Sequence, residues 1–168
     1  MDRAQLQAIQ TPIKARLREE PAAAQITLRA EGSLDPEEIA CSVATGRALV
    51  EAGLHPATGG DGIQACSGDM LLQALVACAG VTLRSVATSM EMRVSGTVRA
   101  EGDLDFRGTL GVDREVPVGF RAIRLLFDLS TDAPAEQVAT LLRLTERYCV
   151  VFQTLAGGVP VSAGLAPG

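Results

Sequence analysis

The stretch CSGDMLLQALVACAG, residues 66–80, decides how the chain is interpreted. Asp69 stands where the first turn of a helix favours a carboxylate, and almost every later position is apolar or small. The pattern predicts a long helix over residues 69–90. A helix that is apolar nearly all round is buried rather than surface-lying. The stretch also carries Cys66 and Cys78, and small neighbours leave room for another helix or a substrate to approach Cys78.

Hydrophobic periodicity places the other elements around this helix. Helices are predicted at 2–20, 69–90 and 132–158, and strands at 24–32, 37–46, 47–53, 92–101, 119–130 and 159–163. Asp132 is expected as the N-cap of the last helix, and residues 107–118 are expected to be irregular. Strands and helices come in blocks, which favours an α+β fold with a mostly antiparallel sheet. We expect a helical extension at 1–24 and one domain at 25–168.

Composition excludes several classes of protein. Among 168 residues, 47% are hydrophobic and 21% are charged, which is typical of a globular chain. A formal charge of −5 and only 3% aromatic residues are unfavourable for nucleic-acid binding. No export signal is recognisable at the N-terminus, and the apolar run 70–83 is shorter than a membrane span. We therefore expect a cytoplasmic protein with no membrane or nucleic-acid partner and with reduced thiols.

The four cysteines, Cys41, Cys66, Cys78 and Cys149, form neither a disulfide framework nor a zinc motif, because no CxxC occurs and His55 is the single histidine. Each cysteine taken alone is ordinarily a small buried residue. Cys78 and Cys149 differ as a pair, since both lie on helix faces expected to point inward. A thiol that acts on an oxidant needs a thiolate, access and often a second thiol.

Two segments resemble the OsmC/Ohr family of osmotically inducible and organic hydroperoxide resistance proteins. DMLLQALVACAG, residues 69–80, is similar to the family helix P-x-E-L-L-L-A-A-L-A-S-C, with its cysteine at Cys78. HPATGGDG, residues 55–62, is similar to the Gly-Gly loop before that helix. ERYCVVFQTL, residues 146–155, resembles the second motif, E-x-x-C-P-V-x-x-x-L, with its cysteine at Cys149. The resemblance covers residues 25–163.

This resemblance implies an intertwined homodimer, in which a curved antiparallel sheet from each chain wraps two central helices. It also implies that Cys78 attacks an organic hydroperoxide and becomes a sulfenic acid, which Cys149 resolves to a disulfide. An external dithiol of the lipoyl type would reduce that disulfide, and no cofactor or metal is implied. The apolar surroundings of Cys78 also favour an organic peroxide, whose alkyl tail would bury apolar surface.

The chain departs from the family pattern at three positions. Gly68 stands where active members carry a glutamate, and Asp69 is one residue away, rotated by about 100° on a helix. Ser67 and Val150 replace family prolines. Active members also use an arginine of the N-terminal sheet to hold the thiolate, and the candidates are Arg47, which we prefer, and Arg29.

Other readings stay open. Cys66 is an alternative resolving thiol. His55 is a candidate base, although a loop histidine is more often a surface or capping residue. The chain as a whole is interpreted as a hydroperoxide reductase, or alternatively as a dimer of the same fold that binds a small apolar ligand or senses redox state without turnover. A purely structural dimer with incidental cysteines is the third reading.

Overall fold

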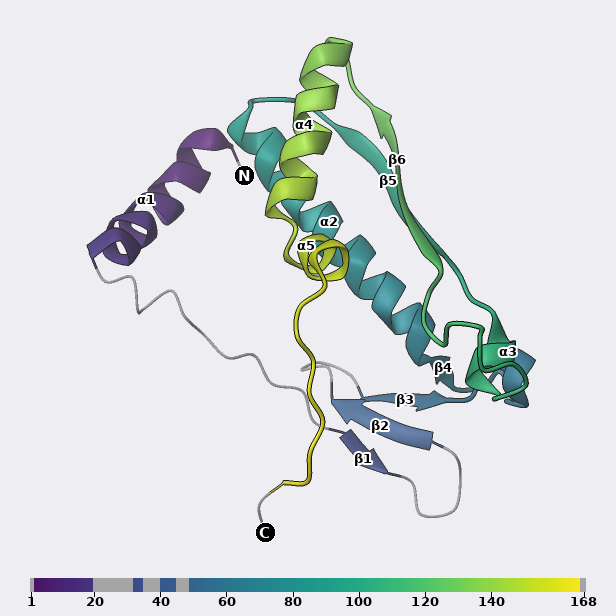
Figure 1. Cartoon of the computed structure of the whole chain (residues 1–168). Helices are drawn as coiled ribbons and strands as arrows, with labels where there is room; N and C mark the ends of the chain where they lie inside the picture. Colours follow the sequence, from purple (N-terminus) through teal and green to yellow (C-terminus); the bar gives the residue numbers. More distant parts are fainter. Residues whose placement is uncertain (1, 20–31, 35–39, 45–48, 167–168) are drawn as a thin grey trace.

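A computed structural model describes residues 2–19, 32–34, 40–44 and 49–166, which form an α+β fold (Figure 1). The α+β class predicted from the sequence is confirmed. In chain order the elements are α1 (Arg3–Glu19), β1 (Gly32–Leu34), β2 (Ala40–Ala44), β3 (Leu49–Gly53), η2 (Pro56–Thr58), β4 (Ala65–Cys66), α2 (Ser67–Ser89), β5 (Ser95–Asp103), α3 (Phe106–Thr109), β6 (Ala122–Ser130), α4 (Ala135–Tyr148) and α5 (Val150–Gly157). The expected domain division at residues 24 and 25 lies outside the described residues and stays a prediction.

The strands of the described residues form two small sheets. The first has the order β1-β2-β3-β4, antiparallel except for the short parallel pairing of β3 with β4. The second is an antiparallel pair of β5 and β6, in register from Ser95 opposite Ser130 to Asp103 opposite Ala122. Alternate residues of β6 are half-buried and exposed, as expected for a strand with one face on a core. The mostly antiparallel arrangement expected from the sequence is therefore present.

Helix α2 is the element around which the core forms, and in Figure 1 it runs beside α4, α5 and the β5–β6 pair. Its buried residues, Leu75, Ala79, Leu83 and Ala87, recur every four positions and make one stripe. Leu83 and Ala87 pack with Leu141 of α4, and Leu75 and Ala79 pack with Cys149. The helix joins directly to β4, so its N-terminal end lies at the first sheet (Figure 1).

Length and composition also make α2 a candidate membrane span. It has 23 residues, and an 18-residue window within it has a mean hydropathy of 1.6, so the helix is longer than the apolar run on which the sequence expectation was based. A single such helix is weak support for a span, because core helices meet the same criterion. The buried stripe of α2 packs on α4, α5 and β5 within the same chain, as a core helix does.

The structure corrects four local predictions. Residues 132–158 are not one helix, because α4 ends at Tyr148 and α5 begins at Val150. The N-cap of α4 is Pro134 rather than Asp132, and it makes no side-chain capping bond. Residues 159–163 form no strand. Within 107–118, the first residues belong to α3, whose N-cap Asp105 accepts a bond from the backbone N–H of Arg107 at 3.2 Å.

Candidate active site

Cys78 lies in the middle of α2 and is half-buried. It follows Leu75 by three residues, so the helix turn carries its side chain to the same face, where it packs on the cluster of Leu75, Ala79 and Cys149. The residue as a whole is thus neither fully exposed nor fully buried. The inward orientation predicted for Cys78 is consistent with this packing.

Cys149 occupies the joint between two helices. It is the C-cap of α4 and the N-cap of α5, with φ −76° and ψ 109°, an extended conformation. Its N–H donates to the Thr145 carbonyl at 2.9 Å, and its own carbonyl accepts from the N–H of Gln153 at 2.9 Å. Its side chain is 0% exposed, so the prediction that Cys149 faces the core is confirmed.

The joint brings the start of α5 to the sulfur of Cys78. Burial acts to raise the pKa of Cys78, but the hydrogen-bonding influence of the Val151 backbone, the Cys149 thiol and the Val150 backbone outweighs burial, and the net pKa is lowered. The first N–H groups of a helix have no partner within the helix, which leaves these amides free to donate. The helix dipole favours a negative charge at the same place.

Thr82 is the weakest of these influences on Cys78. Its hydroxyl has one proton, and it donates that proton to the Cys78 carbonyl oxygen at 2.8 Å. We therefore assign the stabilisation of the thiolate to α5 and Cys149 rather than to Thr82.

The pKa of Cys149 moves in the opposite direction. Burial raises it first; a backbone hydrogen bond from Phe152 lowers it, and the hydrogen bond to Cys78 and the charge on Cys78 raise it further. When one of the two thiols is ionised, the negative charge therefore lies on Cys78 rather than on Cys149. The two cysteines that the sequence paired from opposite halves of the chain are in contact.

The other predicted site residues lie elsewhere. Asp69 is exposed in the first turn of α2, nine residues before Cys78, which places it about 13 Å away along the helix axis. At this distance the Asp69 carboxylate cannot contact the Cys78 sulfur of the same chain. Arg47 and Arg29 lie outside the described residues, so their proximity to Cys78 stays a prediction.

Cys66 is the N-cap of α2 and makes no side-chain capping bond. Twelve residues separate it from Cys78, which is about 18 Å of helix. Disulfides join residues whose Cα atoms are within about 7 Å. The alternative of Cys66 as the resolving thiol for Cys78 of the same chain is therefore wrong.

His55 has a structural role, as the capping interpretation proposed. Its Nδ1 accepts the N–H of Ala57 at 3.0 Å, which caps η2. Its ring stacks on Phe106 of α3 with the centroids 5.0 Å apart. His55 therefore ties the loop before α2 to the loop after β5.

A cavity of about 350 Å³ with a mainly apolar lining lies between α2, β6 and α5, and neither Cys78 nor Cys149 is among its lining residues. It is lined by Leu75, Phe120, Arg121, Ala122, Ile123, Leu125, Phe152, Leu155 and Ala156. Leu75, Ile123 and Phe152 also pack in the cluster that contains both cysteines. The cavity thus shares three lining residues with the cluster that holds the cysteines, and sequence reasoning did not find it because its walls come from three separate elements.

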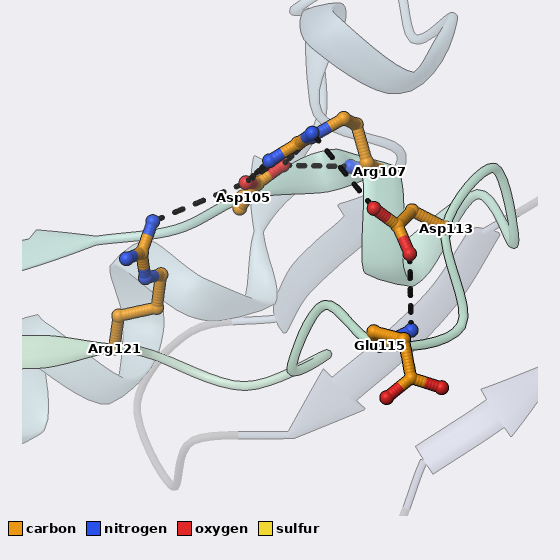
Figure 2. A network of polar contacts seen from close by, with 5 residues as sticks. All are labelled: Asp105, Arg107, Asp113, Glu115 and Arg121. Carbon is orange, nitrogen blue, oxygen red and sulfur yellow. Dashed lines mark hydrogen bonds and ion pairs between the residues drawn. The ribbon is translucent and has the colours of Figure 1, made fainter.

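A polar network holds the loop that carries Phe120 and Arg121 (Figure 2). Arg107 contacts Asp105 at 2.6 Å and Asp113 at 3.9 Å, and Arg121 reaches Asp105 at 4.0 Å. The Arg107 side-chain hydrogen bond is the largest cause that lowers the pKa of Asp105, to about 2. These contacts hold the loop at the edge of the cavity. In the sequence, only the alternation of acidic residues and arginines over residues 103–121 indicates that such contacts form.

Within the part of the chain that the structure describes, no group of three or more His, Cys, Asp or Glu side chains is arranged to hold a metal ion.

Comparison with known proteins identifies the family. A sequence model of the OsmC-like protein family matches residues 59–163, a segment that contains both Cys78 and Cys149. No curated protein sequence matches the chain significantly.

Solved structures share the fold at low sequence identity. An OsmC-like protein from Mycoplasma pneumoniae aligns with a TM-score of 0.65 at 15% identity, covering 80% of this chain and 90% of that one. An organic hydroperoxide resistance protein from Elizabethkingia anophelis aligns with a TM-score of 0.59 at 14% identity, covering 80% and 91%. The organic hydroperoxide resistance protein OhrB of Bacillus subtilis aligns with a TM-score of 0.53 at 16% identity, covering 78% and 93%.

At these identities the alignments show a common fold, and the family match covers more than half of the chain. The resemblance inferred from the two cysteine motifs is confirmed, and the chain belongs to the OsmC-like family.

Proposed function

We propose that the protein is a thiol-dependent reductase of organic hydroperoxides, with Cys78 as the peroxidatic thiol and Cys149 as the resolving thiol. The observation that carries this proposal is the contact between the two cysteines together with the opposite shifts of their pKa values. Two of the solved structures with the same fold are named organic hydroperoxide resistance proteins, which supports this choice of substrate.

The first step uses the Cys78 thiolate as nucleophile. Its sulfur forms a bond to the terminal peroxide oxygen while the O–O bond breaks, and the alkoxide that leaves takes up a proton to become an alcohol. Cys78 is then a sulfenic acid. The amides at the start of α5 stabilise the thiolate before this step, and the half-buried position of the sulfur leaves a path for the substrate.

The second step uses Cys149. Its sulfur attacks the sulfur of the Cys78 sulfenic acid, an S–S bond forms and the S–O bond breaks. The hydroxide that leaves takes the Cys149 proton and departs as water. Because the thiols already touch, little rearrangement is needed. An external dithiol, of lipoyl type by the family resemblance, then reduces the disulfide, and a cytoplasmic location would supply such reductants.

The apolar cavity favours an alkyl or aryl hydroperoxide over hydrogen peroxide. Its lining of aliphatic and aromatic side chains gains free energy from covering an apolar tail, at about 25 cal/mol per Å² of buried apolar surface. The tail would lie between Phe120 and Phe152 while the peroxide group reaches Cys78.

We further propose the homodimer that the family resemblance implies, with curved sheets around two central helices. Exposed apolar side chains on α2, such as Val81 at 73% exposure, would be covered by a second copy. In such a dimer, Asp69 could approach only the Cys78 of the partner, because about 13 Å of helix separates it from its own. Arg47 keeps its proposed role as the thiolate-binding arginine.

The test is a reaction of reduced protein with cumene hydroperoxide, followed by intact mass and free-thiol content. Rapid loss of two thiols and of two hydrogens in mass is expected. Cys78→Ser should abolish peroxide consumption, and Cys149→Ser should leave a sulfenic acid that a dimedone probe captures. If Cys78 stays reduced under excess peroxide, the proposal is refuted.

A second candidate is a dimer of the same fold that binds a small apolar ligand, or senses redox state, without turnover. The cavity of about 350 Å³ and the lack of a carboxylate at Gly68 favour it. Binding of an apolar fluorescent dye that is displaced by alkyl compounds, in a protein with no peroxide consumption, would select this function.

A further inference from the structure

The cavity between α2, β6 and α5 has a mainly apolar lining with a single charge at its edge. Among the described residues that line it, Arg121 alone has a polar side chain, and that side chain is 60% exposed. A guanidinium that is mostly exposed keeps its hydration, so it lies where the cavity meets water. The volume of about 350 Å³ falls within the range of about 300 to 1,000 Å³ that is typical of small-molecule sites.

Backbone contacts fix the position of Arg121 at this edge. Its N–H donates to the Asp103 carbonyl oxygen at 2.8 Å, which extends the pairing of β5 with β6 by one residue. The neighbouring Phe120 forms part of the cavity wall, and it lies so close to Gly102 that a Cβ there would overlap its ring. The arginine is therefore held beside the cavity before a ligand binds, which reduces the entropic cost of binding.

The charge of Arg121 is only weakly compensated within the described residues. Its ion-pair partner is Asp105, whose Oδ2 is 4.0 Å from Arg121 Nη1, well beyond the roughly 3.2 Å that limits an N–H···O hydrogen bond. Asp105 is instead bound by Arg107, whose Nε donates to Oδ1 at 3.0 Å and whose Nη2 donates to Oδ2 at 2.6 Å (Figure 2). In the described part of the chain the Arg121 guanidinium makes no hydrogen bond, so its donors are available to a ligand.

This combination matches a molecule that has an apolar body and one carboxylate at its end. The body would cover aliphatic and aromatic side chains such as Ile123 and Phe152, which is favourable because apolar surface is buried. The planar guanidinium can donate two parallel hydrogen bonds to a carboxylate. A doubly charged head is less suitable, because the Asp105 carboxylate contacts the same guanidinium and would repel the second charge.

We infer that this cavity is a binding site for an apolar monocarboxylate, with Arg121 as the residue that selects the acidic head. The inference goes beyond the proposed functions, which place an apolar group in the cavity and assign no residue to a charge. It requires neither a peroxide bond nor a reactive thiol, because neither cysteine lines the cavity.

The test compares the dissociation constants of octanoate and of its neutral analogue octanamide, measured by titration calorimetry at low salt. The variants are Arg121→Gln, which keeps a polar side chain without the charge, and Arg114→Gln. Arg114 is an exposed arginine of the same loop and does not line the cavity, so its replacement is the matched control for net charge.

Wild-type protein should bind octanoate about two- to fivefold more tightly than octanamide, because an ion pair at an exposed site contributes modestly. Arg121→Gln should lose this preference and keep its affinity for octanamide, whereas Arg114→Gln should retain the preference. Equal affinities for the two probes in wild type would overturn the inference, as would a preference that survives in Arg121→Gln.

Replacing the competing carboxylate gives a test that distortion cannot imitate, because it predicts a gain. Asp105→Asn keeps a residue that can cap α3 and removes the negative charge near Arg121. Octanoate should then bind about two- to fivefold more tightly, with octanamide unchanged. The gain should be absent when Asp105→Asn is combined with Arg121→Gln. No gain in the single variant, or an equal gain in the double variant, would contradict the role of Arg121.

Two further arms locate the site and define the head group. Ala156→Phe introduces a ring from the α5 wall and should weaken the binding of both probes, and unchanged binding would mean that they bind outside the cavity. Octyl phosphate should bind wild type more weakly than octanoate, and tighter binding of octyl phosphate would overturn the choice of a carboxylate.

Neither octanoate nor octanamide is an oxidant, and cumene hydroperoxide has no carboxylate, so the two proposals fail separately. A protein that prefers octanoate through Arg121 but leaves cumene hydroperoxide intact would refute the reductase function and support the monocarboxylate site. Normal peroxide consumption without a preference that depends on Arg121 would do the reverse.

Discussion

Replacing Gly68 tests whether the start of α2 accepts the side chain that the family pattern places there. Gly68 is in the first turn of α2, and a Cβ built on it would lie 3.5 Å from Phe120 Cζ, 3.6 Å from Cys66 Sγ and 3.9 Å from Leu104 Cδ1. All three are ordinary van der Waals distances. The substitution therefore adds contacts without displacing a neighbour.

The magnitude follows from two effects on the helix. Glycine in a helix costs roughly 0.5 to 1 kcal/mol relative to alanine. A carboxylate in the first turn adds about 0.3 to 1 kcal/mol through the helix dipole. Gly68→Ala should thus raise the free energy of unfolding by up to about 1 kcal/mol, and Gly68→Glu by about 1 to 2 kcal/mol. For a chain of this length, that raises Tm by about 2 to 8 °C.

The assay is thermal and urea unfolding of wild type, Gly68→Ala, Gly68→Gln and Gly68→Glu. Glutamine has the length of glutamate without its charge, so the difference between these two variants isolates the dipole effect. Screening by salt should reduce that difference and leave the alanine gain unchanged. A loss of stability in Gly68→Ala would refute the reasoning, because it would mean that Phe120 and Cys66 cannot accept even one carbon.

Three further outcomes are expected. Cys149→Ser should consume about one equivalent of hydroperoxide without forming a disulfide, and detection of a Cys78 disulfide in that variant would contradict the pairing. Burial acts to raise the pKa of Cys78, but the hydrogen-bonding influence of α5 outweighs it and lowers the pKa. The reaction of Cys78 with hydroperoxide should therefore persist to lower pH than that of a free cysteine, and decline as the pH falls through the lowered pKa. A stopped-flow pH profile like that of free cysteine would argue against the site. Leu141→Ala removes a core side chain that is 0% exposed, and should lower the free energy of unfolding by about 2 to 5 kcal/mol in urea titrations. The control Val161→Ala, at 91% exposure, should change the free energy of unfolding by less than about 0.5 kcal/mol. Equal effects of the two substitutions would contradict the assigned core.

Local sequence patterns were sufficient to predict those features of the fold that depend on a single helix or strand. The all-round apolar pattern after Asp69 predicted α2, whose described bounds differ by two residues at its start and one at its end. Gly158 ends α5 with φ 61°, as its position after the last apolar residues predicted. The pairing of Cys78 with Cys149 came from two motifs in series, and the packing of α5 on α2 brings these residues together.

The joint at Cys149 could not be predicted because nothing in its neighbourhood is a helix breaker. The pattern of apolar residues continues from α4 into α5 without a change of period. Position 150 is a valine, whereas a proline there would have indicated the start of a new helix. The capping bond from Cys149 to Thr145 and the docking of Val151 and Phe152 on the core are tertiary features. The donors to Cys78 follow from them and were missed for the same reason.

The joint between α4 and α5 also limits how the chain can change in length. One residue inserted or deleted between Cys149 and Val151 would rotate α5 by about 100° and move it by about 1.5 Å along its axis. Both amides would then turn away from Cys78, and Phe152 would leave the core, although no side chain had been altered. Substitutions at the exposed position 150 are therefore tolerated by the core, while the spacing of this segment is under a far stricter constraint than its composition.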